Sequence, residues 1–60
     1  MYQGGMKSGK KNGRGCEYYN SGRISFSGLF VNGEKNGDGR EFDEDEGLVH
    51  EGQWLNNSKV

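Results

Sequence analysis

The chain has 60 residues, of which 28% are apolar, and its formal net charge is −1 at pH 7. This length allows one domain with a small core, which seldom supplies more than about 3 to 5 kcal/mol. The charge balance and a pI near 5.7 exclude the basic excess that is typical of nucleic-acid-binding domains. A single cysteine, Cys16, allows no internal disulfide, and no apolar run is long enough for a membrane span or a signal peptide.

Residues 2 to 25 are predicted to form the first β-hairpin. Glycines and aromatic residues without proline favour short strands joined by tight turns. Ser8-Gly9 suits a two-residue turn in which both residues take positive φ. A turn at that place predicts three facing pairs, which are Tyr2 with Gly15, Gly4 with Gly13, and Met6 with Lys11.

Residues 26 to 49 repeat this pattern with an offset of 24 residues. Asn32-Gly33 is the strongest turn signal of the chain, because asparagine followed by glycine tolerates positive φ best. Six residues of the first unit (Tyr2, Gly4, Met6, Gly9, Gly13 and Gly15) return as Phe26, Gly28, Phe30, Gly33, Gly37 and Gly39. The facing pairs in this unit would be Phe26 with Gly39, Gly28 with Gly37, and Phe30 with Lys35.

Residues 50 to 60 begin a third unit with His50, Gly52 and Trp54, in which Trp54 would face Lys59. A fixed period of this length indicates a repeat array, whose units bury their apolar faces against stacked neighbours. We therefore predict one all-β segment over residues 1 to 60, a short twisted single-layer ribbon of stacked antiparallel hairpins. Because the third unit is partial and carries no polar cap, we expect a segment of a longer array or a chain that a second copy completes.

The core is expected where rings meet glycines. A glycine leaves a groove in which an aromatic ring can lie, and the lysines can lay their methylene stems along Met6 and Phe30. The register after Gly15 and Gly39 stays open, because a bulge there would change the face of Tyr18 and Phe42. The predicted repeat core consists of Tyr2, Gly4, Met6, Gly13, Gly15, Phe26, Gly28, Phe30, Gly37, Gly39, His50, Gly52 and Trp54.

The order of these residues resembles the MORN repeat, the membrane occupation and recognition nexus motif, in a variant of 24 residues. The matching segments are residues 2 to 9 with Gly13 and Gly15, residues 26 to 33 with Gly37 and Gly39, and residues 51 to 54. The resemblance implies an elongated stack of hairpins that acts as a scaffold, often dimerises and accompanies membranes, cytoskeleton or enzyme domains. Met6, His50 and Asn57 depart from the pattern, at an aromatic, a tyrosine and a turn-glycine position.

Catalysis is not expected. A lone His50 and a lone Cys16 occupy different repeat positions without an orienting partner, and His50 stands where Tyr2 and Phe26 stand in their units. Asp43, Asp45 and Gly47 are similar to the start of a calcium loop, but the further ligands of that pattern are missing. We predict an exposed acidic turn, with no metal, no cofactor and no small-molecule substrate.

The two halves of the chain carry opposite charge. Residues 1 to 30 hold five basic side chains against one acidic, and residues 31 to 60 hold three basic against eight acidic. The halves could guide a partner or direct stacking, or they could be two solvated faces. Lys7, Lys10, Lys11 and Arg14 are the candidate residues for an anionic lipid surface, at about 1 kcal/mol each.

The sequence favours a non-catalytic module for protein contact or self-association at the open repeat end, in the cytoplasm and with a possible link to cytoskeleton or membrane. Two alternatives are a peripheral phosphoinositide-binding module and an accessory segment of a larger enzyme, such as a kinase or methyltransferase. Neither the partner, the parent protein, the oligomeric state nor the binding face follows from the sequence. The candidate partner-binding residues are Tyr18, Tyr19, Phe42 and Trp54.

Overall fold

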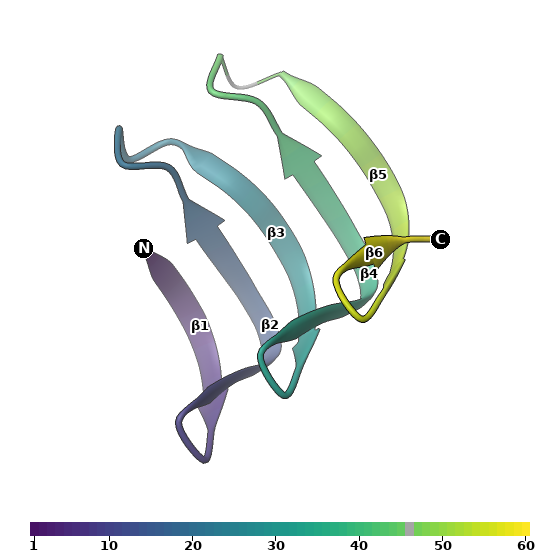
Figure 1. The fold of residues 1–60 in the computed structure, drawn as a ribbon. Coiled ribbons are helices and arrows are strands. Elements are labelled where there is room, and N and C mark those ends of the chain that lie inside the picture. The colour runs from purple at the N-terminus through teal and green to yellow at the C-terminus, as the bar shows by residue number, and fades with distance from the viewer. Residues whose placement is uncertain (46) are drawn as a thin grey trace.

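A computed structural model describes residues 1–45 and 47–60 of the chain. Their strands form one open antiparallel sheet in which the strand order follows the chain, and the ribbon in Figure 1 shows the sheet curving along its length. This arrangement confirms the predicted all-β stack of hairpins. The strands are β1 (Tyr2–Lys7), β2 (Lys10–Tyr18), β3 (Ile24–Val31), β4 (Glu34–Phe42), β5 (Leu48–Leu55) and β6 (Ser58–Lys59).

Each of the three hairpins closes with a two-residue turn. In the second turn φ is 51° at Asn32 and 85° at Gly33, and in the first it is 53° at Ser8 and 78° at Gly9. Positive φ at both positions matches the right-handed twist of the flanking strands, which is why such turns close hairpins. The predicted turn positions are therefore confirmed.

The predicted facing pairs are correct next to the turns and wrong beyond them. Lys11, Lys35 and Lys59 face the residues expected of them. Tyr2 faces Glu17 rather than Gly15, and Gly4 faces Gly15 rather than Gly13. The second hairpin repeats both differences, since Phe26 faces Glu41 and Gly28 faces Gly39.

The error arises from an irregularity that the sequence did not place. Between Gly4 and Met6 lies one residue of β1, whereas three residues of β2 lie between their partners Gly15 and Lys11. Gly13 has a φ of 85°, and its equivalent Gly37 has a φ of 105°. These glycines interrupt the pairing within their own hairpin, while they stay paired with Phe30 and Trp54 of the next hairpin. Because side chains alternate between the two faces of a strand, a shift of two residues leaves each side chain on the predicted face of the sheet and changes only the residue that it faces.

A second irregularity lies between β2 and β3 and fixes the register after Gly15 that the sequence left open. Glu17 faces Phe26, but the next pair joins Tyr18 to Ile24, so β3 carries the extra residue. The Tyr18 hydroxyl approaches Gln3 Oε1 at 3.4 Å. Because Gln3 alternates with Tyr2 along β1, Tyr18 lies on the face opposite to the Tyr2 ring.

The core lies on one face of the sheet and is almost entirely aromatic. Phe26, Phe30 and Trp54 are 1%, 2% and 5% exposed, and Tyr2 packs against them. Met6, which the sequence placed in the core, is 57% exposed, because none of the described strands covers the outer side of β1. We call the side that carries Tyr2, Phe26, Phe30, His50 and Trp54 the aromatic face.

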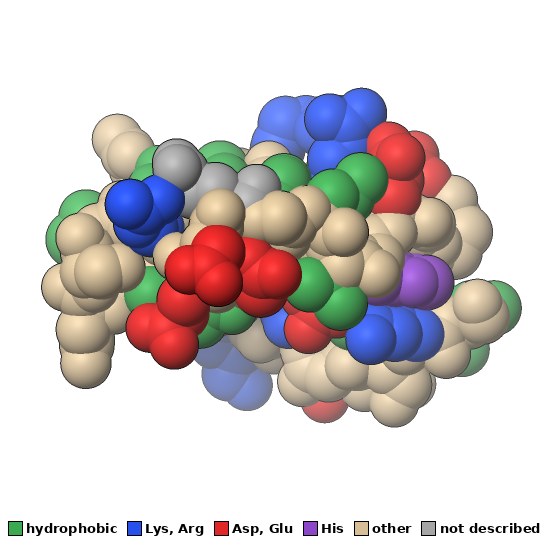
Figure 2. All heavy atoms as spheres, turned by 90° about the horizontal axis from the view of Figure 1, so that it is seen from above, with side chains coloured by type: hydrophobic (Ala, Val, Ile, Leu, Met, Phe, Trp, Pro, Cys, Tyr) green, Lys and Arg blue, Asp and Glu red, His purple; other side chains and the backbone are tan. Residues whose placement is uncertain are grey.

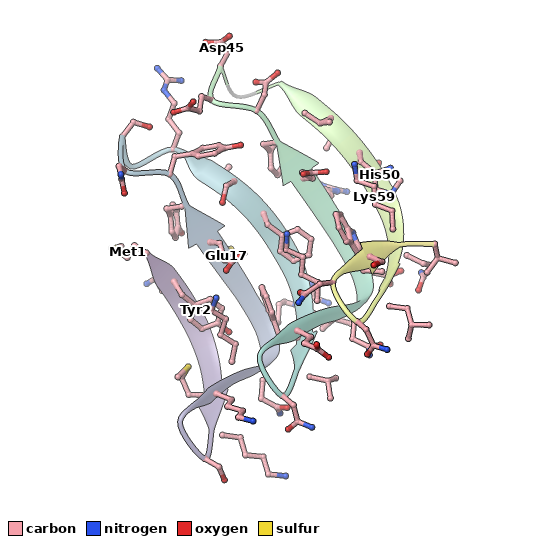
Figure 3. All side chains as sticks on the ribbon, viewed as in Figure 1. Met1, Tyr2, Glu17, Asp45, His50 and Lys59 are labelled. Atoms are coloured by element: carbon pink, nitrogen blue, oxygen red, sulfur yellow. The ribbon has the colours of Figure 1, made fainter. Side chains whose placement is uncertain are left out.

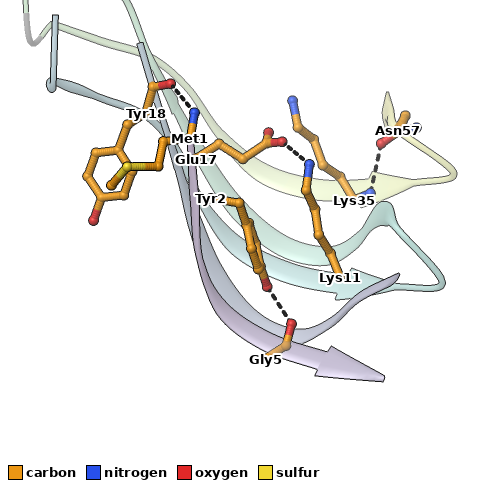
Figure 4. A network of polar contacts seen from close by, with 8 residues as sticks. All are labelled: Met1, Tyr2, Gly5, Lys11, Glu17, Tyr18, Lys35 and Asn57. Carbon is orange, nitrogen blue, oxygen red and sulfur yellow. Dashed lines mark hydrogen bonds and ion pairs between the residues drawn. The ribbon is translucent and has the colours of Figure 1, made fainter. Parts of the chain in front are cut away.

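Backbone hydrogen bonds join the second and third hairpin turns to the second strand of the preceding hairpin. Gly33 N donates to Lys11 O at 2.8 Å, and Asn57 N donates to Lys35 O at 3.0 Å, at equivalent positions of successive units. Asn57 stands where the other units have glycine, and its Oδ1 also accepts from Lys35 N at 2.8 Å (Figure 4). This departure from the repeat thus adds a hydrogen bond between hairpins. In the described residues we find no helix of the length and apolarity needed to cross a bilayer.

Candidate functional site

The aromatic face is a continuous ladder of rings. Tyr2 contacts Phe30, Phe30 contacts Phe26, and Phe26 contacts Trp54, with ring centroids 5.2 to 5.4 Å apart and planes close to perpendicular. His50 continues the ladder beyond Trp54 at 5.5 Å. Edge-to-face pairs of this kind contribute about 0.5 to 1.5 kcal/mol each beyond the area that they bury.

Lysines lie over the contacts between rings of neighbouring hairpins. Lys35 Nζ is 4.5 Å from the Phe26 centroid and 4.9 Å from that of Trp54. Lys11 Nζ lies in the same way over Tyr2 and Phe30, at 5.3 and 5.7 Å. The sequence predicted lysine stems along Met6 and Phe30. The structure places the ammonium groups over rings of two neighbouring hairpins, and the ring faces attract these cations.

Glycines lie beneath the rings, although not as their direct partners. A Cβ at Gly39 would overlap the Phe26 ring, and a Cβ at Gly15 would overlap the Tyr2 ring. Each ring therefore reaches diagonally across the strand pair. It covers the glycine that lies two residues before the glutamate that its own residue faces, and aromatic side chains span this distance easily. The groove that the sequence predicted exists, and the glycines that form it are Gly15 and Gly39.

The ladder ends at the outer side of β5. β6 pairs with β5 at Trp54 and Leu55 alone, so the residues from His50 to Gly52 have no strand on that side among the described residues. We call the outer backbone of His50, Glu51 and Gly52 the β5 edge. Figure 3 shows His50 and Lys59 together at this side of the sheet, and Tyr2 at the other.

The backbone of Glu51 points outward at the β5 edge. Gln53 O accepts from Val60 N at 3.0 Å, so the carbonyl of Gln53 points away from β4. Backbone direction alternates along a strand, and the pairing of β5 with β4 is regular from His50 to Trp54. The amide and carbonyl of Glu51 therefore face the same way as those of Gln53 and form an unpaired sheet edge.

Two buried polar atoms near this edge have no hydrogen-bond partner within the described ranges. They are His50 Nε2 and Trp54 Nε1. Glu41 Oε1 has no hydrogen bond of good geometry either, although Lys59 Nζ lies 3.0 Å from it as an ion pair. Buried polar groups are nearly always satisfied, so the cluster indicates an arrangement that further contacts would complete.

The four candidate lipid-binding residues do not share one surface. Lys11 lies on the aromatic face, where its Nζ pairs with Glu17 at 2.5 Å (Figure 4). Arg14 faces Leu29, which alternates with the buried phenylalanines, and so lies on the opposite face. Lys7 and Lys10 face each other beside the first turn. The structure thus leaves only this last pair as neighbours.

The candidate partner-binding aromatics also have structural contacts. Trp54 is buried in the ladder and is not an exposed anchor. The Tyr19 hydroxyl donates to Phe42 O at 2.6 Å and links the first long turn to β4. Tyr18 and Phe42 are half-buried. Burial thus closes Trp54 to a partner, whereas Tyr18, Tyr19 and Phe42 stay partly exposed. The β5 edge, which the sequence did not single out by residue, adds an unpaired backbone among the described residues.

The residues considered for catalysis lie on different faces. Cys16 faces Ser27 on the side away from the rings, with Sγ and Oγ 3.5 Å apart, whereas His50 contacts Trp54 on the aromatic face. Within residues 1–45 and 47–60 no group of three or more histidine, cysteine, aspartate or glutamate side chains is placed to hold a metal.

The first aspartate of the acidic turn accepts hydrogen bonds from the backbone of the same turn. Asp43 Oδ1 accepts hydrogen bonds from Asp45 N at 2.9 Å and from Gly47 N at 2.8 Å. Figure 2, which looks onto the ends of the strands that carry the long turns, shows acidic side chains gathered in the middle of the view. Glu46, which belongs to the predicted turn, lies outside the described residues.

The face opposite the rings carries a shallow hollow that sequence reasoning missed. Its volume is about 420 Å³, and charged side chains from β4 and β5 pair beside it, with Arg40 Nε 2.7 Å from Glu51 Oε2 and Gln53 bonded to Asp38. The glycine positions could have indicated it, because residues without side chains in adjacent strands leave a depression. The lining residues are Arg14, Ser27, Gly28, Asp38, Gly39, Arg40, Glu51 and Gly52.

Comparisons of the chain with protein-family models, with curated proteins and with solved structures found no match. The resemblance to the MORN repeat therefore stays a hypothesis that rests on the residues named above.

Proposed function

We propose that the chain is a non-catalytic interaction module, similar to a MORN repeat segment, that docks another polypeptide at the β5 edge. One observation carries the proposal: in the part of the chain that the structure describes, β6 pairs with β5 only at Trp54 and Leu55 and leaves the backbone of Glu51 unpaired. Addition of a strand to such an edge supplies main-chain hydrogen bonds for affinity, and side-chain pockets supply specificity.

Self-association is the first form of this function to test. If two copies of the chain associate through this edge, light scattering over a wide concentration range should show assemblies that grow with concentration. Glu51→Pro removes the outward amide at the β5 edge and should abolish the growth of these assemblies, since proline has no backbone N–H to donate to an added strand. Glu51→Thr is the matched control, because it loses the same ion pair with Arg40 but keeps the amide.

Docking of a different polypeptide is the second form. Amide NMR signals of Glu51 and its neighbours should shift when extended hexapeptides of varied sequence are added. A chain that stays monomeric at every concentration, and whose β5 amides respond to none of these peptides, would contradict the proposed function.

The two alternative functions remain hypotheses with less structural support. Anionic lipid binding now depends on Lys7 and Lys10, since Lys11 is paired with Glu17 and Arg14 lies on the opposite face. Co-sedimentation with anionic vesicles should be lost in the double variant Lys7→Gln, Lys10→Gln if that function is correct. An accessory role beside an enzyme domain rests on the resemblance alone.

A further inference from the structure

The kind of strand that fits the β5 edge can be inferred from the strands that pair with β3 at the equivalent positions of the preceding unit. β3 carries Phe26 and Phe30, and it pairs with β2 on one side and with β4 on the other. On one side Phe26, Ser27 and Gly28 face Glu17, Cys16 and Gly15, and on the other they face Glu41, Arg40 and Gly39. Both neighbours therefore present the same tripeptide pattern, Gly-x-Glu, in the same register.

β5 has this pattern on its inner side only. Gly52, Glu51 and His50 face Gly39, Arg40 and Glu41 of β4. On the outer side β6 has the register of the preceding units, because Trp54 faces Lys59 as Phe30 faces Lys35. By this equivalence, a strand added at the outer side of β5 would have a glycine facing Gly52, a variable residue facing Glu51 and a glutamate facing His50.

The glycine is required by the ring above it. The Tyr2 and Phe26 rings each lie across the glycine of the second strand in their own hairpin, where a Cβ would overlap ring atoms. His50 is the equivalent ring of the third unit, and its half-buried imidazole extends from the aromatic face at the β5 edge. A strand with a larger residue at that position would meet the imidazole.

The glutamate is favoured by the cation beside it. In the first hairpin Glu17 pairs with Lys11 at 2.5 Å, and Lys59 is the equivalent of Lys11. Lys59 instead reaches back to Glu41, whose Oε1 has no hydrogen bond of good geometry. A carboxylate facing His50 would give both Lys59 and the unpartnered His50 Nε2 an acceptor.

We propose that the β5 edge binds an extended segment of another polypeptide that carries Gly-x-Glu, antiparallel to β5, with its glycine facing Gly52 and its glutamate facing His50. This inference rests on the proposed function and names the chemistry of its partner. A second copy of the chain does not fit, because its Gly-x-Glu segments, Gly15 to Glu17 and Gly39 to Glu41, lie within β2 and β4 and already have strands on both sides.

The probe is a synthetic peptide with the sequence of residues 36 to 42, Asn-Gly-Asp-Gly-Arg-Glu-Phe, added to the intact chain. Amide NMR should show shifts centred on His50, Glu51 and Gly52. The peptide with Gly39→Leu should bind about tenfold more weakly, as expected for overpacking of about 1.4 kcal/mol. The peptide with Glu41→Gln should lose less affinity than the leucine peptide. Lys59→Met in the protein should remove the difference in affinity between the glutamate and the glutamine peptides.

Three outcomes would overturn the inference. Equal binding of the glycine and leucine peptides at β5 would leave the proposed function intact but remove the Gly-x-Glu preference. Shifts centred on Tyr2 to Gly4 would move the site to the β1 side of the sheet. No shift with this peptide, combined with a response of the β5 amides to other hexapeptides, would show that the edge selects a different sequence. Because the peptide variants leave the protein unchanged, none of these results depends on a variant that fails to fold.

Discussion

Met6, Phe30 and Trp54 occupy the same position in successive units, yet they are 57%, 2% and 5% exposed. Phe30 lies against Tyr2 of the preceding hairpin, and Trp54 lies against Phe26 in the same way. Among the described residues, no hairpin packs against Met6 in this way. Burial in a repeat is therefore a property of two neighbouring units, and an identical position at the end of the sheet contributes much less to stability.

The most severe test of this comparison is truncation of the ring position. Phe30→Ala should lower the free energy of unfolding by about 3 to 5 kcal/mol, the usual range for a buried phenylalanine. A domain of this length holds about 3 to 9 kcal/mol in total, so much of the chain should unfold at 25 °C. Urea denaturation followed by circular dichroism measures the change.

Met6→Ala is the matched variant, and it should lower the free energy of unfolding by less than about 1 kcal/mol, as is usual for exposed sites. Losses of similar size in the two variants would show that the exposed position packs as tightly as the buried one in solution.

Adding a methyl group beneath the rings should have the next largest effect. At Gly39 the new Cβ would overlap the Phe26 ring and lie 2.9 Å from Trp54 Cδ1, and both rings are buried. Gly39→Ala should therefore destabilise the chain by about 1 to 3 kcal/mol. Thermal unfolding should show a smaller loss for Gly15→Ala, because Tyr2, its one ring neighbour, is half-buried at the sheet edge and can move aside. A larger loss of stability for Gly15→Ala than for Gly39→Ala would contradict the ring contacts of the aromatic face.

Removing a cation from between two rings should have a moderate effect. Lys35→Met keeps the apolar stem but loses the ammonium group over Phe26 and Trp54, and should cost about 1 kcal/mol. Lys10→Met, at an exposed position, serves as the control and should leave the urea midpoint nearly unchanged. If Lys35→Met stabilises the chain, burial of the apolar stem outweighs the attraction of the cation.

The smallest expected change concerns the third turn. Asn57→Gly removes the hydrogen bond from Lys35 N to Asn57 Oδ1, which contributes about 0.5 to 1.5 kcal/mol. Glycine at a φ of 70° offsets part of that loss. We expect a net loss of less than about 1 kcal/mol and faster hydrogen exchange at the Lys35 amide. An unchanged exchange rate would mean that water replaces the asparagine side chain.

Much of the fold could be predicted because the period and the turns are local signals. Asn32-Gly33 specifies its own backbone, and the turn fixes the pairs next to it, such as Phe30 with Lys35. The pairs beyond Gly13 and Gly37 could not be predicted, since a glycine is compatible with both a regular strand and a positive φ. One such residue shifted each later pair by two positions.

The candidate site was less accessible to sequence reasoning. The sequence did not indicate which backbone would lack a partner, and among the described residues the structure places it at Glu51. Trp54 illustrates the opposite case, because an aromatic residue near the chain end has the composition of an interface anchor but is buried against Phe26.

The sequence by itself determined the repeat of 24 residues, the hairpin turns and the face on which the rings lie, because each of these depends on local backbone preference and strand alternation. Only the tertiary structure decided which lysine lies over two rings and which strand keeps an unpaired edge among the described residues. Those features depend on contacts between hairpins, and such contacts follow from the register of strands that are far apart in the chain.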